Sequence, residues 1–214
     1  MKGRWSRVAP LTGLPFVGLL VAAFIIGGNT PDTDWSPQRV VSFYEAHRTA
    51  QIAAAILLAY GVLFVLLFGA ALRAHLRARS SSDGVIALGF AGVIVFGIGV
   101  LTFSGFGLAA ADVPGKIDPA AEQALSVLAN DTFIAFLLGM AVFMFGNGLA
   151  IVRTGVLPKW LGWVAVVIGI VAVTPVGWFG LFGMLAWTLV VSVLMFMREG
   201  KAAAPPAAAT APAV

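Results

Sequence analysis

The chain has 214 residues, of which 60% are hydrophobic, 25 are glycine and only 10% are charged. Soluble domains have about 45–50% apolar residues and about 25% charged residues, so this composition excludes both a water-soluble globule and a disordered chain. The net charge of +4 does not indicate a nucleic-acid partner, because basic residues of membrane proteins gather in cytoplasmic loops. We therefore expect an all-α, polytopic membrane helix bundle in contact with a lipid bilayer.

Uncharged stretches of the chain predict the membrane spans, because a spanning helix needs about 20 mostly apolar residues. Four such stretches are residues 8–28, 49–72, 84–111 and 132–152. A fifth, residues 160–197, would be about 57 Å long as one helix, which is too long for one crossing. Thr174-Pro175-Val176-Gly177 predicts a break within it. The sequence thus predicts six transmembrane helices.

These spans define one integral membrane domain, residues 1–201. The remaining residues, 202–214, are rich in alanine and proline and predict a disordered tail. Pairs of small residues four positions apart recur in several spans, which supports close helix packing but does not locate an interface.

Two short amphipathic helices are expected in the loops that follow the first and third spans. Ser36-Pro37 and Asp118-Pro119 each place a capping side chain before a proline suited to the first helical position. The apolar stripes are Val40, Val41, Tyr44 and His47 in the first, and Ala121, Ala124, Leu125 and Leu128 in the second. The polar faces carry Gln38, Ser42, Glu45 and Thr49, and Glu122, Gln123, Ser126 and Asn130. We expect the apolar stripes to cover the outer end of the bundle as a lid; the alternative is a surface that docks a partner or the membrane.

The pattern of span, outer helix and span occurs twice, at an offset of 82 residues. Because the first and third spans run in the same direction, this pattern predicts a parallel internal repeat. The alternative is that any helical hairpin with a loop of medium length gives the same pattern.

Lysine and arginine predict the orientation. Ten of them fall in the terminal segments and the loops on the same side, and three fall in the opposite loops. By the positive-inside rule both termini are expected in the cytoplasm.

No familiar catalytic, cofactor or metal site is present in the sequence, so we expect a protein that is not an enzyme. There is no cysteine, and His47 and His75 are the only histidines. A helix between these two would separate them by about 42 Å, so within one chain they cannot share a metal or a haem.

Four polar residues are the candidates for a functional site. Glu45, His47 and Asp131 fall at the predicted outer rim, where they could bind a cation or respond to pH. The alternative is that they are solvated charges at helix ends, with Asp131 stabilising a helix amino terminus. Asn147, in Gly146-Asn147-Gly148, is the most unusual polar residue within a span; it either contacts a substrate or bonds to a neighbouring helix.

Two segments resemble a known group of proteins. They are Thr30-Pro31-Asp32-Thr33-Asp34, followed by Ser36-Pro37 and Phe43-Tyr44, and the run Arg153-Thr154-Gly155-Val156-Leu157-Pro158-Lys159-Trp160-Leu161-Gly162-Trp163. They are similar to the loops of a widespread group of uncharacterised multi-span bacterial membrane proteins, classed by a domain of unknown function. The resemblance extends over residues 8–198 and implies a location in the bacterial plasma membrane. It implies no ligand and no site residues.

Two functions are consistent with these features. The first is a scaffold or partner of another envelope component, associated with a membrane protein or with further copies of this chain. The second is a small transporter or channel for a neutral or lipidic solute. It predicts a polar cavity among the first four spans, lined by Tyr60, Ser104 or Asn147.

Overall fold

The computed structural model describes residues 8–78 and 83–202, and these residues are helical with no strand. The elements are η1 (Ala9–Thr12), α2 (Gly13–Gly27), α3 (Pro37–Arg77), α4 (Asp83–Asp112), α5 (Pro119–Asp131), α6 (Phe133–Thr154), α7 (Lys159–Ala172) and α8 (Gly177–Ala202). The expected all-α fold class is therefore confirmed.

Five stretches of helix are long and apolar enough to cross a membrane, so the chain is a multi-span helical membrane protein by length and composition. The expected sixth span corresponds to α7, which has only 14 residues and is about 21 Å long. The turn between α7 and α8 falls at residues 173–176, where Pro175 was expected to break the helix.

The expectation of two separate outer helices is wrong for the first of them. Residues 37–48 are the first turns of α3, which continues to Arg77 without interruption for 41 residues. No proline follows Pro37 in this helix and the first glycine is Gly61, so nothing ends the helix before it enters the apolar segment. The second outer helix, α5, is separate, but only Thr132 lies between it and α6.

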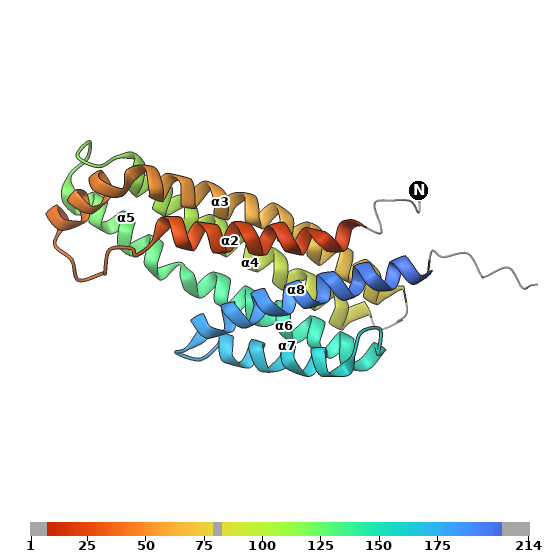
Figure 1. Cartoon of the computed structure of the whole chain (residues 1–214). Coiled ribbons are helices and arrows are strands. Elements are labelled where there is room, and N and C mark those ends of the chain that lie inside the picture. The colour runs from red at the N-terminus through yellow and green to blue at the C-terminus, as the bar shows by residue number, and fades with distance from the viewer. Residues whose placement is uncertain (1–7, 79–82, 203–214) are drawn as a thin grey trace, which may run out of the picture.

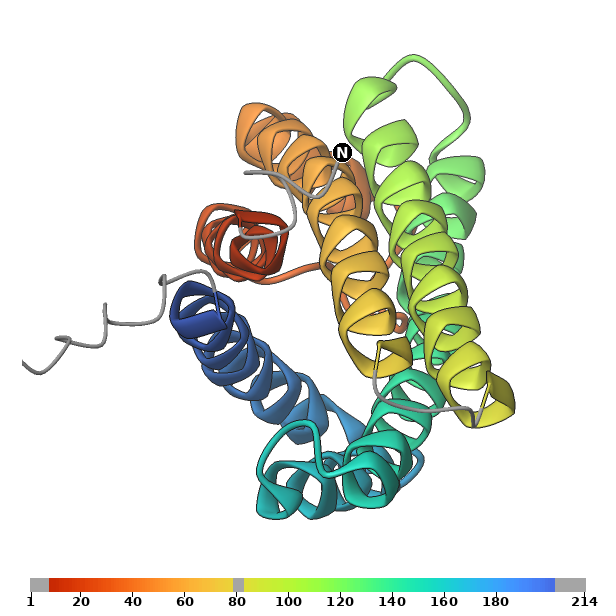
Figure 2. The same cartoon turned by 90° about the vertical axis from the view of Figure 1, so that its right-hand side faces the viewer.

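Six helices form a ring in chain order. Each of α2, α3, α4, α6, α7 and α8 packs against the next, and α8 returns to contact α2 and η1 (Figure 2). The short helix α5 lies across the ends of α3 and α4.

The two ends of this ring differ in charge. The end with α5 and the loops 28–36 and 113–118, here called the acidic end, carries seven acids and three bases. They are Asp32, Asp34, Glu45, Asp112, Asp118, Glu122 and Asp131, and Arg39, Arg48 and Lys116. The opposite, basic end carries the described residues Arg73, Arg77, Arg153, Lys159 and Arg198 (Figure 1).

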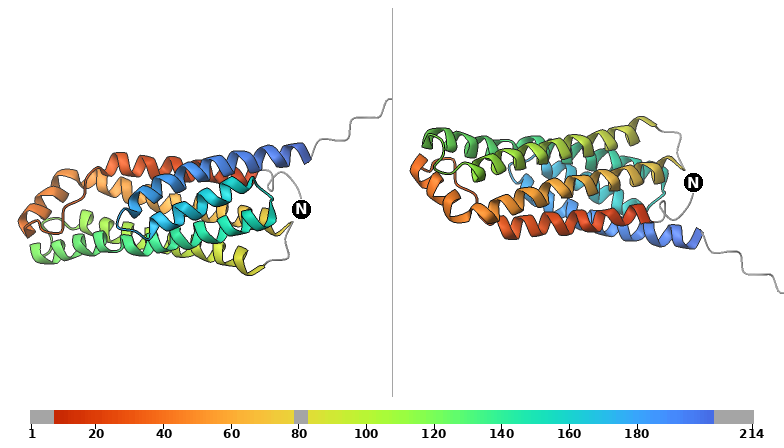
Figure 3. Two further views of the ribbon diagram at one scale, coloured as in Figure 1. Left: turned by 90° about the horizontal axis from the view of Figure 1, so that it is seen from below. Right: turned by 90° about the horizontal axis from the view of Figure 1, so that it is seen from above.

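The helices do not all reach the acidic end. The turn between α7 and α8 stops well short of α5 and of the first turns of α3, as both views in Figure 3 show. The outer part of the acidic end is therefore built by α2 to α6, and α8 reaches only its base with Trp178.

Glycine and phenylalanine interlock where α4 and α6 pack antiparallel. A β-carbon at Gly92 would lie 2.2 Å from the Phe143 backbone nitrogen, and one at Gly139 would lie 2.2 Å from that of Phe96. The facing pairs are Gly89 with Gly146, Gly92 with Phe143, Phe96 with Gly139, and Gly99 with Phe136. Each glycine lets the partner backbone approach closely, as small residues do in membrane helix pairs.

Candidate functional site

A pocket of about 1100 Å³ lies at the acidic end of the bundle. Its walls are the last turns of α2, the loop 28–36, one face of α3, the ends of α4 and α5, and the first residues of α6 and α8. It exists because α8 begins short of this end, so the last turns of α2 have no helix beside them on that side (Figure 1). There, α2 makes no extensive contact with α5 or α6.

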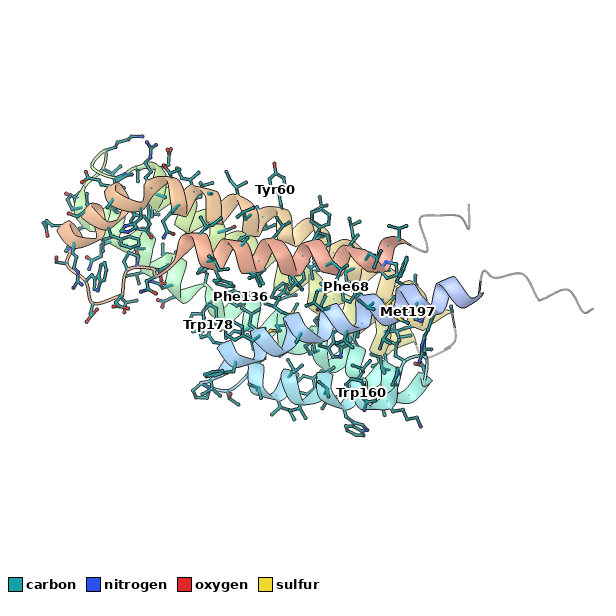
Figure 4. The ribbon with its side chains drawn as sticks, viewed as in Figure 1. Tyr60, Phe68, Phe136, Trp160, Trp178 and Met197 are labelled. Carbon is teal, nitrogen blue, oxygen red and sulfur yellow. The ribbon has the colours of Figure 1, made fainter. Side chains whose placement is uncertain are left out.

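The base of the pocket is aromatic. Trp178, at the start of α8, stacks on Phe133 with ring centres 5.9 Å apart. The same indole meets Phe24 edge-on at 6.2 Å and Phe136 at 5.5 Å. Figure 4 shows Phe136 and Trp178 between the end of α2 and the start of α8.

A much smaller apolar cavity, of about 10 Å³, continues from this base into the bundle. Phe24, Leu58 and Phe103 line both the pocket and the cavity. The other residues that line the cavity are Leu20, Phe96, Val100, Phe136 and Leu181. The site is therefore polar at its rim and becomes wholly apolar with depth.

Three side-chain amides fasten the last residue of α2 and the loop 28–36, which line the pocket. Gln51 donates to the carbonyl oxygen of Gly27 at 2.8 Å, Gln123 to that of Trp35 at 2.6 Å, and Asn130 to that of Pro31 at 2.8 Å. Because the donors come from α3 and α5, they tie the loop to two helices and hold the rim in one arrangement.

Other polar groups of the lining are held by short-range contacts. The His47 ring stacks on Phe43 at 4.5 Å, and its Nδ1 lies 2.9 Å from the Phe43 carbonyl oxygen. Asp32 accepts a hydrogen bond from the Trp35 indole at 3.1 Å. The Tyr44 hydroxyl reaches Ser126 Oγ at 3.5 Å.

The structure brings together two of the four candidate residues. His47 and Asp131 both line the pocket. Glu45 lies near Gly115 instead, where a β-carbon on that glycine would be 3.2 Å from Glu45 Oε1. Asn147 is buried within the α4–α6 contact and donates to the Phe143 carbonyl oxygen at 2.8 Å.

Of the residues that a transporter was expected to use, Ser104 lines the pocket. Tyr60 does not, because its side chain points away from the bundle (Figure 4). The aromatic lining was not expected from the sequence, since its residues come from five helices and a loop with no common spacing.

The expected orientation of α5 is wrong. Glu122 is 0% exposed and Ser126 is buried, whereas Leu128, from the apolar stripe, is 47% exposed. Leu125 alone of that stripe packs inward, against Val40, Tyr44, Ala110 and Ala111. The surface beneath α5 supplies loop carbonyls and the Tyr44 hydroxyl, so the polar residues of α5 find partners there that an apolar stripe could not use.

Glu122 lies outside the expected spans. Neither of its carboxylate oxygens has a hydrogen-bond partner among the described residues. Burial raises the pKa of this carboxyl above its ordinary range; the nearby Gly115 backbone N–H, which does not form a regular hydrogen bond with it, lowers the pKa in part, and the Glu45 carboxylate adds to the rise.

Arg48 fastens α3 to the end of α4 rather than facing the pocket. It forms an ion pair with Asp112 at 2.7 Å and donates to the Ala111 carbonyl oxygen at 3.2 Å. The hydrogen bond from Arg48, together with the charge of Lys116, lowers the pKa of the Asp112 carboxyl. The contact joins α3 to the end of α4 at the acidic end.

Among residues 8–78 and 83–202 no three histidine or acidic side chains gather closely enough to hold a metal ion. The chain matches no family model, no curated protein and no solved structure.

Proposed function

We propose that this protein is a non-enzymatic membrane protein that binds a lipidic, amphipathic molecule in the pocket at its acidic end. The observation that carries the proposal is a lining that is polar at the rim and apolar at depth. Ligand pockets are largely apolar with a few placed polar groups, and this pocket matches such sites in size as well. A molecule with a polar head and an apolar tail fits this gradient.

A carrier or receptor is favoured over a channel. The basic half of the bundle is filled by fully buried side chains such as Phe68, Leu72, Leu76, Ile151 and Leu161. The interlocked glycines and phenylalanines of α4 and α6 further close the centre. The pocket thus enters from one end of the bundle, and a solute would need a change of conformation to pass through.

The scaffold function is the second candidate. The observation in its favour is the exposed stripe Ala121, Ala124 and Leu128 on α5, which is free of contacts to the bundle core. It requires a protein that co-purifies in fixed stoichiometry. Four further features remain predictions: the location in a bacterial plasma membrane, the cytoplasmic position of both termini, the internal repeat and the resemblance to a group of bacterial membrane proteins.

Two glycines of α4 provide a matched pair of variants. Gly107 lines the pocket and Gly105 does not, and a β-carbon at either position meets open space. Gly107→Trp should therefore fill the pocket without disturbing the helix, while Gly105→Trp adds the same side chain outside it.

The test uses a monoacylglycerol with a photoreactive diazirine at the end of its chain, in nanodiscs of phosphatidylcholine. We expect the probe to label Leu58, which is only 7% exposed and so is shielded from bulk lipid. Gly107→Trp should abolish this labelling and Gly105→Trp should retain it. Labelling confined to exposed residues such as Ile98 and Phe182, unchanged by either variant, would exclude the proposed binding.

A further inference from the structure

We propose that the molecule bound in the pocket carries a cationic headgroup, so that the ligand class is a cationic amphiphile. This inference rests on the proposed function and adds the chemistry of the head. Its basis is the charge and the aromatic character of the lining, together with the positions of the neighbouring bases.

The lining contains two carboxylates and no lysine or arginine. Asp32, in the loop after α2, and Asp131, at the end of α5, lie in segments that are joined by the hydrogen bond from Asn130 to the Pro31 carbonyl oxygen. An anionic head such as a phosphate or carboxylate would meet only like charge here. A cationic head would be attracted by both acids.

The three basic residues of the acidic end are engaged elsewhere. Arg48 pairs with Asp112, and Lys116 donates to the Asp112 carbonyl oxygen at 2.8 Å. The Arg39 guanidinium lies 3.8 Å above the centre of the Trp35 ring. None of the three lines the pocket, and none forms an ion pair with Asp32 or Asp131 among the described residues.

Aromatic rings supply a second attraction for a cation. Seven of the residues lining the pocket are aromatic: Phe24, Trp35, Phe43, Tyr44, Phe103, Phe133 and Trp178. Cations bind over the faces of such rings, and Arg39 already does so on Trp35. Pockets built from aromatic rings and carboxylates suit ammonium groups, whereas a neutral sugar or glycerol head would leave both charges unpaired.

The electrostatic field of the whole acidic end also favours a cation. The acidic end carries seven acids and three bases. This excess of negative charge raises the local concentration of cations. This long-range attraction weakens with salt, while contacts within the pocket persist better. The two contributions can therefore be separated by experiment.

The experiment is a competition against the photoreactive monoacylglycerol in the same nanodiscs. The competitors share one sixteen-carbon chain and differ in head: hexadecyltrimethylammonium, monopalmitoylglycerol and hexadecyl sulfate, each at equal mole fraction. We expect the ammonium compound to suppress labelling of Leu58 most strongly and the sulfate least. Equal suppression by all three, or strongest suppression by the sulfate, would overturn the cationic head while leaving the proposed pocket intact.

Variants then locate the charge. Asp131→Asn should reduce the potency of the ammonium competitor by about 2- to 5-fold, the range for a partly exposed charge pair, and leave the neutral competitor unchanged. Asp34→Asn is the matched control, because Asp34 also lies at the acidic end, is exposed and does not line the pocket. An equal loss from both variants would show that the general field, and not the pocket, selects the cation. Absence of Leu58 labelling by the probe itself would instead overturn the proposed function.

Discussion

Glu122 is a carboxylic acid with no exposed surface and no hydrogen-bond partner among the described residues. It holds this position because α5 turns its polar side toward α3 and α4. A buried and unpartnered carboxylate is costly, and the folded state therefore favours its protonated form. Ionisation of Glu122 therefore lowers the stability of the folded protein.

The first prediction is that Glu122→Gln stabilises the protein at neutral pH. The pKa of Glu122 is raised in the folded state above the ordinary 4.5. Its destabilising effect is absent below about pH 4, grows as the pH rises through the raised pKa, and is complete above it. The apparent melting temperature in detergent, followed by tryptophan fluorescence, should therefore rise by a few degrees at pH 8 and remain unchanged at pH 4.

Asp34→Asn serves as the control, since it removes the same charge from an exposed position. It should leave the pH dependence of melting as it is in the wild type. Destabilisation by Glu122→Gln at pH 8 would mean that the carboxylate has a partner that stabilises it.

At the residue scale, the sequence shows which polar residues stand out, but it predicts less well which residues surround them in the fold. His47 and Asp131 stand out because they are ionisable groups at the ends of apolar stretches, and both line the pocket. The burial of Glu122 is missed because helical periodicity separates the polar face of α5 from the apolar face, but does not show what kind of surface each face packs on. That surface is made by loops distant in sequence, including the Trp35 carbonyl that Gln123 binds.

At the scale of elements, the contact between α4 and α6 depends on glycine at defined positions. Glycines of each helix lie against the backbone of the other at phenylalanine positions, so the partner backbone occupies the space that any side chain would need. The sequence shows many small residues in the spans, but only the relative register of the two helices shows which of them matter.

The second prediction follows from this register. Gly92→Ala should destabilise the protein by about 1–3 kcal/mol, the usual cost of overpacking, because the new methyl group would collide with the Phe143 backbone. Gly105→Ala, in the same helix but facing open space, should be neutral or stabilising by up to about 1 kcal/mol. Denaturant titration in mixed micelles gives both values. Similar effects of the two variants would contradict the interlocked arrangement.

Element boundaries follow the sequence where a breaker is present. Pro175 and Gly177 mark the turn before α8, and Pro119 begins α5. Between Glu45 and Thr49 the chain changes from charged to apolar with no breaker, so composition suggested two helices where the backbone forms one. A change of surroundings from water to lipid need not interrupt a helix.

At the scale of the whole molecule, charge is sorted to the two ends. The acids gather with α5, and the described bases gather mostly at the other end. This distribution depends only on the count and order of spans, and so the sequence predicts it well. The pocket is different, because it arises from the unequal reach of helices that lie far apart in the chain.

The third prediction concerns the orientation of the molecule in the membrane. The chain has no cysteine, so single cysteines can be introduced without background. Gln38 and Ala120 are exposed at the acidic end and Ala78 is exposed at the basic end. An impermeant thiol reagent added to intact cells should label Gln38→Cys and Ala120→Cys, but label Ala78→Cys only after lysis. Labelling of Ala78→Cys in intact cells would reverse the orientation.

The short reach of α7 has a consequence for the membrane itself. At about 21 Å it falls roughly 9 Å below the usual hydrocarbon thickness of about 30 Å. The turn that follows and the first residues of α8 carry exposed Val173, Val176 and Phe179 and no charge, so they tolerate contact with lipid. Lipids beside α7 relieve such a mismatch by thinning, at a fraction of a kcal/mol per ångström. The bilayer surface would then dip toward Trp178, at the base of the pocket, so that headgroups reach the open side of the pocket beside α2 and an amphiphile could enter sideways without its head leaving the interface.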